Sequence, residues 1–173
     1  MRWFVETVAR TPIGATFNQY ASGRRAPLLR ARLVDYLEAR SESRLLLVGE
    51  AAGYRGARVS GLPFTSERQV TGAGPAEATA SIVHRVLAEL GLEDDVLLWN
   101  VVPTHPGTSS SNRRPTRAEV NSGLPFVRRL ARGRRVIAVG RVAQAALEAP
   151  YVRHPSHGGA GPFREGLAAL AIG

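Results

Sequence analysis

Four short apolar runs along the chain predict β-strands. They span residues 45–48, 96–99, 135–140 and 151–153. The first is followed by glycine, the second by asparagine, and the third ends in glycine. A continuous apolar run that stops in this way is typical of a strand buried on both faces of a parallel sheet. We therefore expect a mainly parallel sheet of four strands.

Apolar residues with helical spacing lie between these runs. Leu29, Leu33 and Leu37 fall on one stripe of residues 26–40, and Thr116-Arg117-Ala118-Glu119 has the spacing of a capping box that starts a helix. The other predicted helices span residues 75–90, 142–147 and 163–172, and the capping box begins one that runs to residue 132. Strands that alternate with helices predict an α/β fold, a three-layer α/β/α arrangement, with residues 1–173 as a single domain.

Polar side chains follow the predicted strands. Glu50 comes just after the first strand, Asn100 directly after the second, and His154 directly after the fourth. The carboxyl ends of strands in an open α/β sheet share one crevice. A carboxylate, a carboxamide and an imidazole in that crevice are suited to a flat, hydrogen-bonding ring such as a nucleobase.

Composition excludes several enzyme classes. The chain has no cysteine, which rules out disulfides, iron-sulfur clusters, thiolate zinc sites and cysteine nucleophiles. All 23 basic side chains are arginine, so no lysine is available for a Schiff base or a Walker-type phosphate loop. The formal net charge of +9 favours a polyanionic partner such as nucleic acid over a basic surface without a partner.

No membrane or secretion signal is evident in the sequence. No stretch is long and apolar enough to span a bilayer, and the first six residues lack the apolar block of a secretion signal. We therefore expect a cytoplasmic protein that has no membrane partner. We also expect a monomer.

In order along the chain, a set of motifs resembles the uracil-DNA glycosylase superfamily. The likeness covers residues 45–168 and is closest to the branch whose first motif reads Gly-Glu-Ala-Pro-Gly. The motifs are Gly49-Glu50-Ala51-Ala52-Gly53, Gly61-Leu62-Pro63-Phe64-Thr65, the strand that ends at Asn100, Ser111-Asn112-Arg113-Arg114-Pro115-Thr116, Gly140 after the third strand, and Arg153-His154-Pro155-Ser156. That branch holds an iron-sulfur cluster on four cysteines, which this chain lacks, so no cofactor is expected.

The resemblance implies a role for each motif residue. Phe64 matches the ring on which the flipped base stacks, and Asn100 the carboxamide that reads its edge. His154 matches the imidazole that stabilises the departing base, and Glu50 the active-site carboxylate of the closest branch. Ala51 stands where the better-known branch has an aspartate, so the resemblance does not identify the group that activates the water molecule.

The resemblance also implies contacts around the base. The tyrosine that excludes the methyl group of thymine in the familiar enzymes falls at Gly53, which leaves Tyr54 or the chain near Gly56 for that role. The residues expected to contact DNA are Thr65, Arg113, Arg114, Arg153, Ser156 and His157. His105 is either a pocket residue or a bystander, and His84 is expected on the surface.

These implications predict a monofunctional DNA glycosylase that excises a deaminated base, uracil first, and leaves an abasic site for base excision repair. One alternative is a protein that binds uracil-containing or abasic DNA with little or no turnover, and another is a glycosylase that prefers hypoxanthine or xanthine. A metal-dependent hydrolase built on His154 and His157 is disfavoured, because that pair has no matching second pair at metal-ligand spacing. No metal site is expected.

Overall fold

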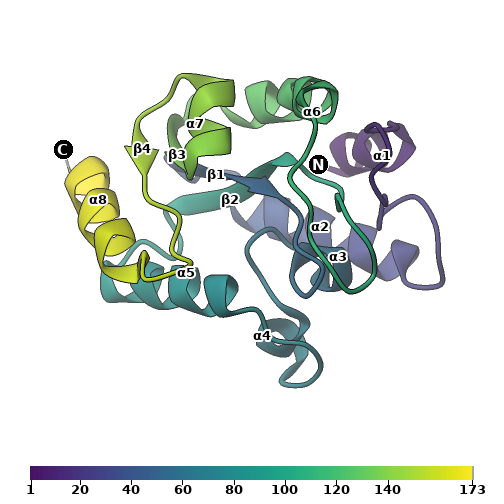
Figure 1. Ribbon diagram of the computed structural model, residues 1–173, viewed down its shortest axis with the longest axis horizontal. Helices are drawn as coiled ribbons and strands as arrows, with labels where there is room; N and C mark the ends of the chain where they lie inside the picture. The colour runs from purple at the N-terminus through teal and green to yellow at the C-terminus, as the bar shows by residue number, and fades with distance from the viewer. Residues whose placement is uncertain (173) are drawn as a thin grey trace.

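The computed structural model describes residues 1–172, which contain a four-stranded sheet with the order β2-β1-β3-β4. All neighbouring strands pair in parallel. The strands are β1 (Leu45–Ala51), β2 (Val96–Val102), β3 (Arg135–Val139) and β4 (Tyr151–Val152). The expected α/β fold with a parallel four-stranded sheet is confirmed (Figure 1).

Helices connect and cover these strands. They are α1 (Arg2–Arg10), α2 (Ala26–Ala39), α3 (Ala57–Ser60), α4 (Glu67–Thr71), α5 (Ala78–Glu89), α6 (Arg117–Leu130), α7 (Arg141–Leu147) and α8 (Ala160–Ile172). Five of them match predicted helices, and the capping box of α6 is present. The prediction lacked α1, and it treated the short helices α3 and α4 as part of one long loop.

The alternation of side chains along the strands divides the core into two layers. Leu46 and Val48 of β1 pack with α1, α2, α6 and α7, whereas Leu45 and Leu47 pack with α5 and α8. Because successive residues of a strand point to opposite faces, a continuous apolar run can bury both faces of the sheet. Figure 1 shows α6 and α7 on one side of the sheet and α5 on the other.

The strand order places a topological switch at β1. The chain passes from β1 to β2 on one side and then returns to β3 on the other side. Connections that diverge in this way open a crevice at the carboxyl ends of the strands. Two strands are longer than predicted, so Glu50 belongs to β1 and Asn100 to β2. No helix within residues 1–172 has the length and apolar character needed to cross a membrane.

Candidate active site

A cleft of about 420 Å³ opens at the carboxyl end of the sheet, and a smaller recess of about 60 Å³ adjoins it. The two cavities share Glu50, Ala51, Gly53, Glu77, Thr79 and His154. Phe64, Asn100 and Ala57 complete the recess. The structure therefore brings together an aromatic ring, a carboxamide, an imidazole and a carboxylate from four separate segments of the chain.

Phe64 and Asn100 meet over Gly49. A Cβ atom on Gly49 would lie 2.8 Å from Cε2 of Phe64 and 2.9 Å from Oδ1 of Asn100. Glycine at this position therefore leaves the space that both side chains occupy. Asn100 is only 4% exposed, and its side-chain amide forms no hydrogen bond with any of residues 1–172. In a buried position, such an unpaired amide is suited to a polar ligand.

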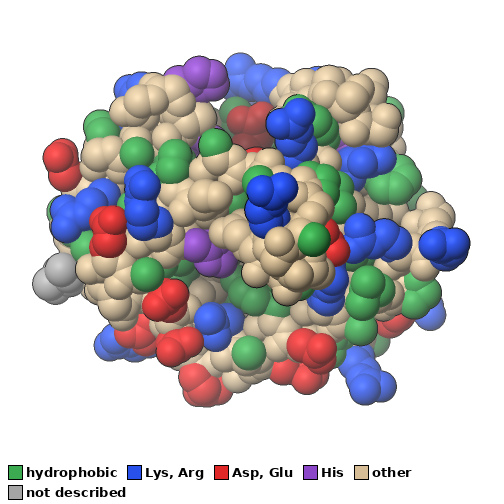
Figure 2. Space-filling view, turned by 90° about the horizontal axis from the view of Figure 1, so that it is seen from below, with side chains coloured by type: hydrophobic (Ala, Val, Ile, Leu, Met, Phe, Trp, Pro, Cys, Tyr) green, Lys and Arg blue, Asp and Glu red, His purple; other side chains and the backbone are tan. Residues whose placement is uncertain are grey.

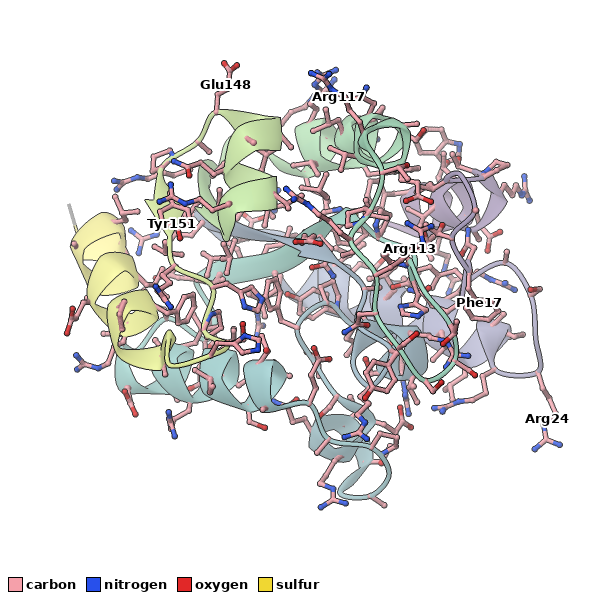
Figure 3. The ribbon with its side chains drawn as sticks, viewed as in Figure 1. Phe17, Arg24, Arg113, Arg117, Glu148 and Tyr151 are labelled. Atoms are coloured by element: carbon pink, nitrogen blue, oxygen red, sulfur yellow. The ribbon has the colours of Figure 1, made fainter. Side chains whose placement is uncertain are left out.

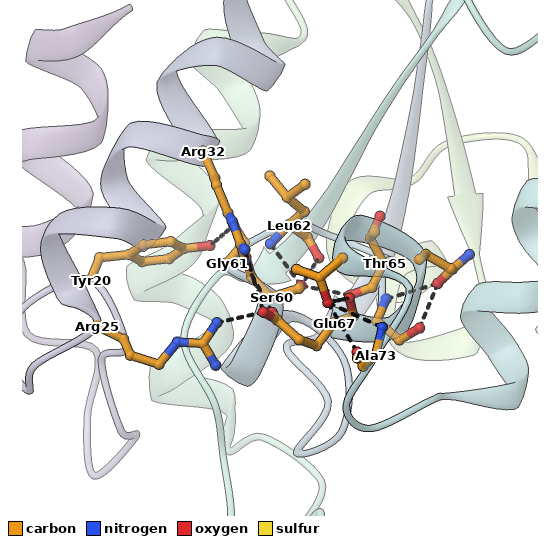
Figure 4. A network of polar contacts seen from close by, with 12 residues as sticks. Tyr20, Arg25, Arg32, Ser60, Gly61, Leu62, Thr65, Glu67 and Ala73 are labelled. Carbon is orange, nitrogen blue, oxygen red and sulfur yellow. Dashed lines mark hydrogen bonds and ion pairs between the residues drawn. The ribbon is translucent and has the colours of Figure 1, made fainter.

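The loop that carries Phe64 is held by polar contacts beneath it (Figure 4). The Ser60 hydroxyl donates to the Thr65 carbonyl oxygen at 2.6 Å, and the Tyr20 hydroxyl donates to the Gly61 carbonyl oxygen at 2.8 Å. Glu67 anchors the start of α4. Its carboxylate accepts hydrogen bonds from Arg25, the N-cap residue of α2, at 2.7 Å and from Arg32 within α2 at 2.9 Å.

Phe64 itself has a φ of +51°, in the left-handed region that side chains other than glycine rarely adopt. Such a backbone costs about 1 to 3 kcal/mol and persists where the surroundings impose it, often at functional sites. His157, which lines the outer cleft, has the same positive φ of +51°. Two of the three non-glycine residues with positive φ within residues 1–172 thus lie at the cleft.

His154 is oriented by the loop that follows β4. Its Nδ1 atom lies 2.8 Å from the Ser156 hydroxyl and accepts from the Ser156 backbone N–H at 3.3 Å. When Nδ1 of a neutral imidazole accepts, the ring proton resides on Nε2. Burial and the nearby charge of His157 lower the pKa of His154, which favours this neutral form. Nε2 has no hydrogen-bond partner among residues 1–172, so its N–H is available in the recess.

Glu50 and Ala51 form the floor shared by the recess and the outer cleft. Burial raises the pKa of Glu50, and the positive charge of Arg114 opposes that rise. The carboxylate therefore lies within the field of a cation. Ala51 contributes only its backbone and a methyl group at this position.

Tyr54 and His105 have different relations to the cleft. Tyr54 lines the outer cleft, its backbone N–H donates to Asn112 Oδ1 at 2.9 Å, and the Arg55 guanidinium lies 5.3 Å from its ring centre. His105 is fully buried behind the site, with Nδ1 2.8 Å from the Ala52 carbonyl oxygen and Nε2 2.7 Å from that of Thr108. It supports the loops of the site and does not line the cleft.

Three of the residues expected to contact DNA line the outer cleft, namely Arg113, Ser156 and His157. The Arg113 guanidinium is bound by Glu119 at 2.6 and 2.8 Å, and it lies on the loop that follows β2 (Figure 3). Arg114 and Arg153 are exposed beside the cleft and do not line it.

The position of Thr65 differs from the expectation that this residue contacts DNA. It is only 7% exposed, its hydroxyl donates to the Pro63 carbonyl oxygen at 3.0 Å, and the same hydroxyl lies 3.0 Å from His84 Nε2. A buried hydroxyl with these partners is not available to a phosphate, so Thr65 supports the Phe64 loop instead. His84 is consequently half-buried beneath that loop and not on the surface as expected.

The sequence reasoning missed Glu77. This residue directly precedes α5, and its side chain lines both the outer cleft and the recess. A carboxylate at the start of a helix is ordinarily interpreted as a cap or as a partner of the helix dipole, so nothing in the sequence marked it as a site residue.

Within residues 1–172, no group of three or more side chains has the arrangement of a metal site.

Charge on the surface is unevenly distributed. Figure 2 shows acidic side chains gathered along the lower edge of one face, with arginine side chains spread over the rest of that face. The formal net charge is +9. Such a surface attracts a polyanion over distances of about a Debye length.

Comparison with known proteins agrees with the geometry. A family model described as the Uracil DNA glycosylase superfamily matches residues 36–170. The crystal structure of wild-type SMUG2 from Pedobacter heparinus matches in fold, with a TM-score of 0.65 and 12% sequence identity over 98% of this chain and 99% of that chain. Among curated protein sequences, none matches. Because the family model covers most of the sequence, this chain belongs to the uracil-DNA glycosylase superfamily.

Proposed function

We propose that the protein is a monofunctional DNA glycosylase that hydrolyses the N-glycosidic bond of a deaminated base, uracil first, and leaves an abasic site. Membership of the superfamily supports a glycosylase that acts on DNA. The observation that carries the proposal is the recess in which Phe64, Asn100, His154 and Glu50 converge. The net charge of +9 favours DNA as the partner.

In the proposed mechanism, the base leaves the duplex and stacks on Phe64, a contact worth about 1 to 3 kcal/mol. The Asn100 amide offers both a donor and an acceptor to the pyrimidine edge. As the bond between C1′ and the base breaks, its electron pair moves to the base. The Nε2–H of His154 stabilises the negative charge that collects on the base oxygen, and one such donor contributes about 3 to 4 kcal/mol.

The sugar side of the reaction falls to Glu50. A carboxylate there stabilises the oxocarbenium-like transition state and orients the water molecule that attacks C1′. The proton of that water passes to the carboxylate or to solvent. No lysine is present to form a Schiff base with the abasic sugar, so the strand remains uncut.

The test is base release from a labelled oligonucleotide that contains one uracil, followed by hot alkali to cleave abasic sites. We expect release by the parent chain and a loss of about 100-fold or more in His154→Ala and Asn100→Ala. Asn121→Ala, which removes an exposed carboxamide on α6, is the matched control and should retain full activity.

Three outcomes would contradict the proposal. Absence of release from uracil, hypoxanthine and xanthine substrates would refute the enzymatic function. A gel shift with uracil-containing or abasic DNA but no base release in a single turnover would instead support a binding protein. Normal turnover in both active-site variants would show that the pocket is misplaced.

A further inference from the structure

Glu77 occupies a space that the preceding loop leaves open for it. A Cβ atom on Gly53 would lie 2.8 and 2.9 Å from the two carboxylate oxygens of Glu77, and a Cβ atom on Gly56 would overlap one of them. Both glycines have backbones close against the carboxylate. A side chain at either position would therefore displace Glu77 from the cleft.

The fold does not account for this carboxylate. Glu77 is the N-terminal cap residue of α5, yet its side chain forms no capping hydrogen bond and no hydrogen bond or ion pair with any of residues 1–172. The two more deeply buried glutamates differ, because Glu67 and Glu119 are each held by arginine. In a chain with 23 arginines, an unpaired and half-buried carboxyl group is not explained by a shortage of cations.

The two carboxyl groups of the site have different surroundings. Glu50 lies in the field of Arg114, which opposes the effect of burial on its pKa. Burial also raises the pKa of Glu77, and no cation opposes the rise. Burial therefore favours the protonated form of both groups, and of the two only Glu50 has a cation within residues 1–172 that favours its carboxylate. Different surroundings of two carboxyl groups are the usual basis for a base and an acid in one site.

Building on the proposed function, we propose that Glu77 is a general acid that protonates the departing base when that base is a deaminated purine, hypoxanthine or xanthine. Glu77 lies on the boundary of the recess and the outer cleft, where a two-ring base that fills the recess must extend. As the glycosidic bond breaks, its electron pair moves to the base. The O–H of Glu77 transfers its proton to a ring nitrogen, so the purine leaves as a neutral molecule and Glu77 becomes a carboxylate.

The reaction then balances through water. Water attacks C1′ and loses a proton to Glu50 or to solvent, and Glu77 regains its proton from solvent after the base departs. Uracil depends less on this acid, because it leaves as an anion whose charge is shared by its carbonyl oxygens and is stabilised by His154. An ionised Glu77 would repel that anion, which is a second reason for the group to be neutral.

The proposal predicts a specific pH dependence. Glu77 must be protonated, so purine excision should fall as the pH rises through its raised pKa. Other titratable groups also face Glu77 across the cleft, from β1, the loops that follow β1 and β2, and the segment after β4. They are Glu50, Tyr54, Arg55, Arg113, His154 and His157. Because these groups are common to all variants, comparison with Glu77→Gln isolates the contribution of Glu77.

The experiment measures single-turnover base release from oligonucleotides with one uracil or one hypoxanthine across a range of pH. In Glu77→Gln we expect hypoxanthine release to slow by about 100-fold and to lose its alkaline decline, and uracil release to slow to a much smaller extent. Glu42→Gln, an exposed carboxylate replaced by the same amide, is the control. Thermal unfolding should show that Glu77→Gln folds as stably as the parent, since the Glu77 side chain makes no hydrogen bond within residues 1–172.

The outcomes separate this inference from the proposed function. Release of uracil but not hypoxanthine by the parent chain would overturn the inference alone. Equal slowing of both substrates in Glu77→Gln, or a pH profile of unchanged shape, would also overturn it. Release of neither base would refute the proposed function and this inference with it.

Discussion

Glu119 is expected to be the strongest pH-dependent anchor of the site, and replacing it tests the electrostatic reasoning. Its carboxylate accepts from the Arg113 guanidinium at 2.6 and 2.8 Å, from the Thr116 backbone N–H at 2.8 Å and from the Ala15 backbone N–H at 3.2 Å. The side chain is only 2% exposed. It therefore joins the N-terminal segment, the loop after β2 and the start of α6.

The magnitude follows from the pKa of this group. Hydrogen bonds from Arg113 lower the pKa of Glu119 from 4.5 to about 2. This shift corresponds to about 3 kcal/mol of stability at pH 7. Arg113 is 38% exposed, so water screens the pair and we expect a measured effect of about 1.5 to 3 kcal/mol.

The sign of the pH dependence is fixed by the lowered pKa. The stabilisation is complete above the unfolded pKa of 4.5 and is lost as the pH falls towards about 2. Glu119→Gln should therefore be less stable than the parent by the full amount at pH 7, and only about two fifths of that difference should remain at pH 3.

Urea unfolding of the two proteins at both pH values measures this difference. Glu42→Gln, an exposed carboxylate on the loop before β1, is the control and should match the parent at both pH values. A difference between Glu119→Gln and the parent that is the same at pH 7 and pH 3 would refute the reasoning, because the lost stability would not then depend on ionisation of Glu119.

Three further predictions concern packing and charge. Gly49→Ala should raise KM for uracil-containing DNA by about tenfold in steady-state assays, because its methyl group displaces the Phe64 ring, and an unchanged KM would contradict the packing. Gly123→Ala should lower the free energy of unfolding in urea by about 1 to 3 kcal/mol, since the added Cβ meets the backbone of β2; equal stability would show that α6 can shift. His157→Gln should raise the pKa of His154 in an NMR titration, because it removes a nearby positive charge; no change would exclude that coupling.

Most of the architecture was predictable from periodicity alone. The strands and five of the helices follow from apolar runs and stripes that reflect burial on the two faces of one sheet. Helix α1 was missed although Phe4, Val5 and Val8 form an apolar stripe at helical spacing that is buried in the core, so the signal for this helix was present in the sequence. Helices α3 and α4 are single turns, too short to produce a period.

The site was only partly predictable, and the reason is physical. Phe64, Asn100 and His154 follow motifs whose local geometry determines where the side chain points, and all three line the recess. Thr65 belongs to the same motif as Phe64 but points beneath the loop and pairs with His84, which is a contact across 19 residues. Sequence spacing within a loop does not reveal which of two adjacent side chains faces the cleft.

Three glycines near the site are visible in the sequence, but the reason for each depends on side chains from other parts of the chain. Glycines 49 and 53 read along the sequence as features of a turn, yet neither has a positive φ that would require glycine. Gly56 differs, because its φ of −101° and ψ of −118° lie outside the regions that other residues favour. The structure gives a steric reason at each position, because a Cβ at residue 49 would meet Phe64 and Asn100, and a Cβ at 53 or 56 would meet Glu77. Their common requirement is space for side chains that come from elsewhere in the chain. At positions 49 and 53 glycine is therefore required for space and not for backbone conformation, and Ala at 53 should impair the chemistry that depends on Glu77 while leaving the strand and the loop intact.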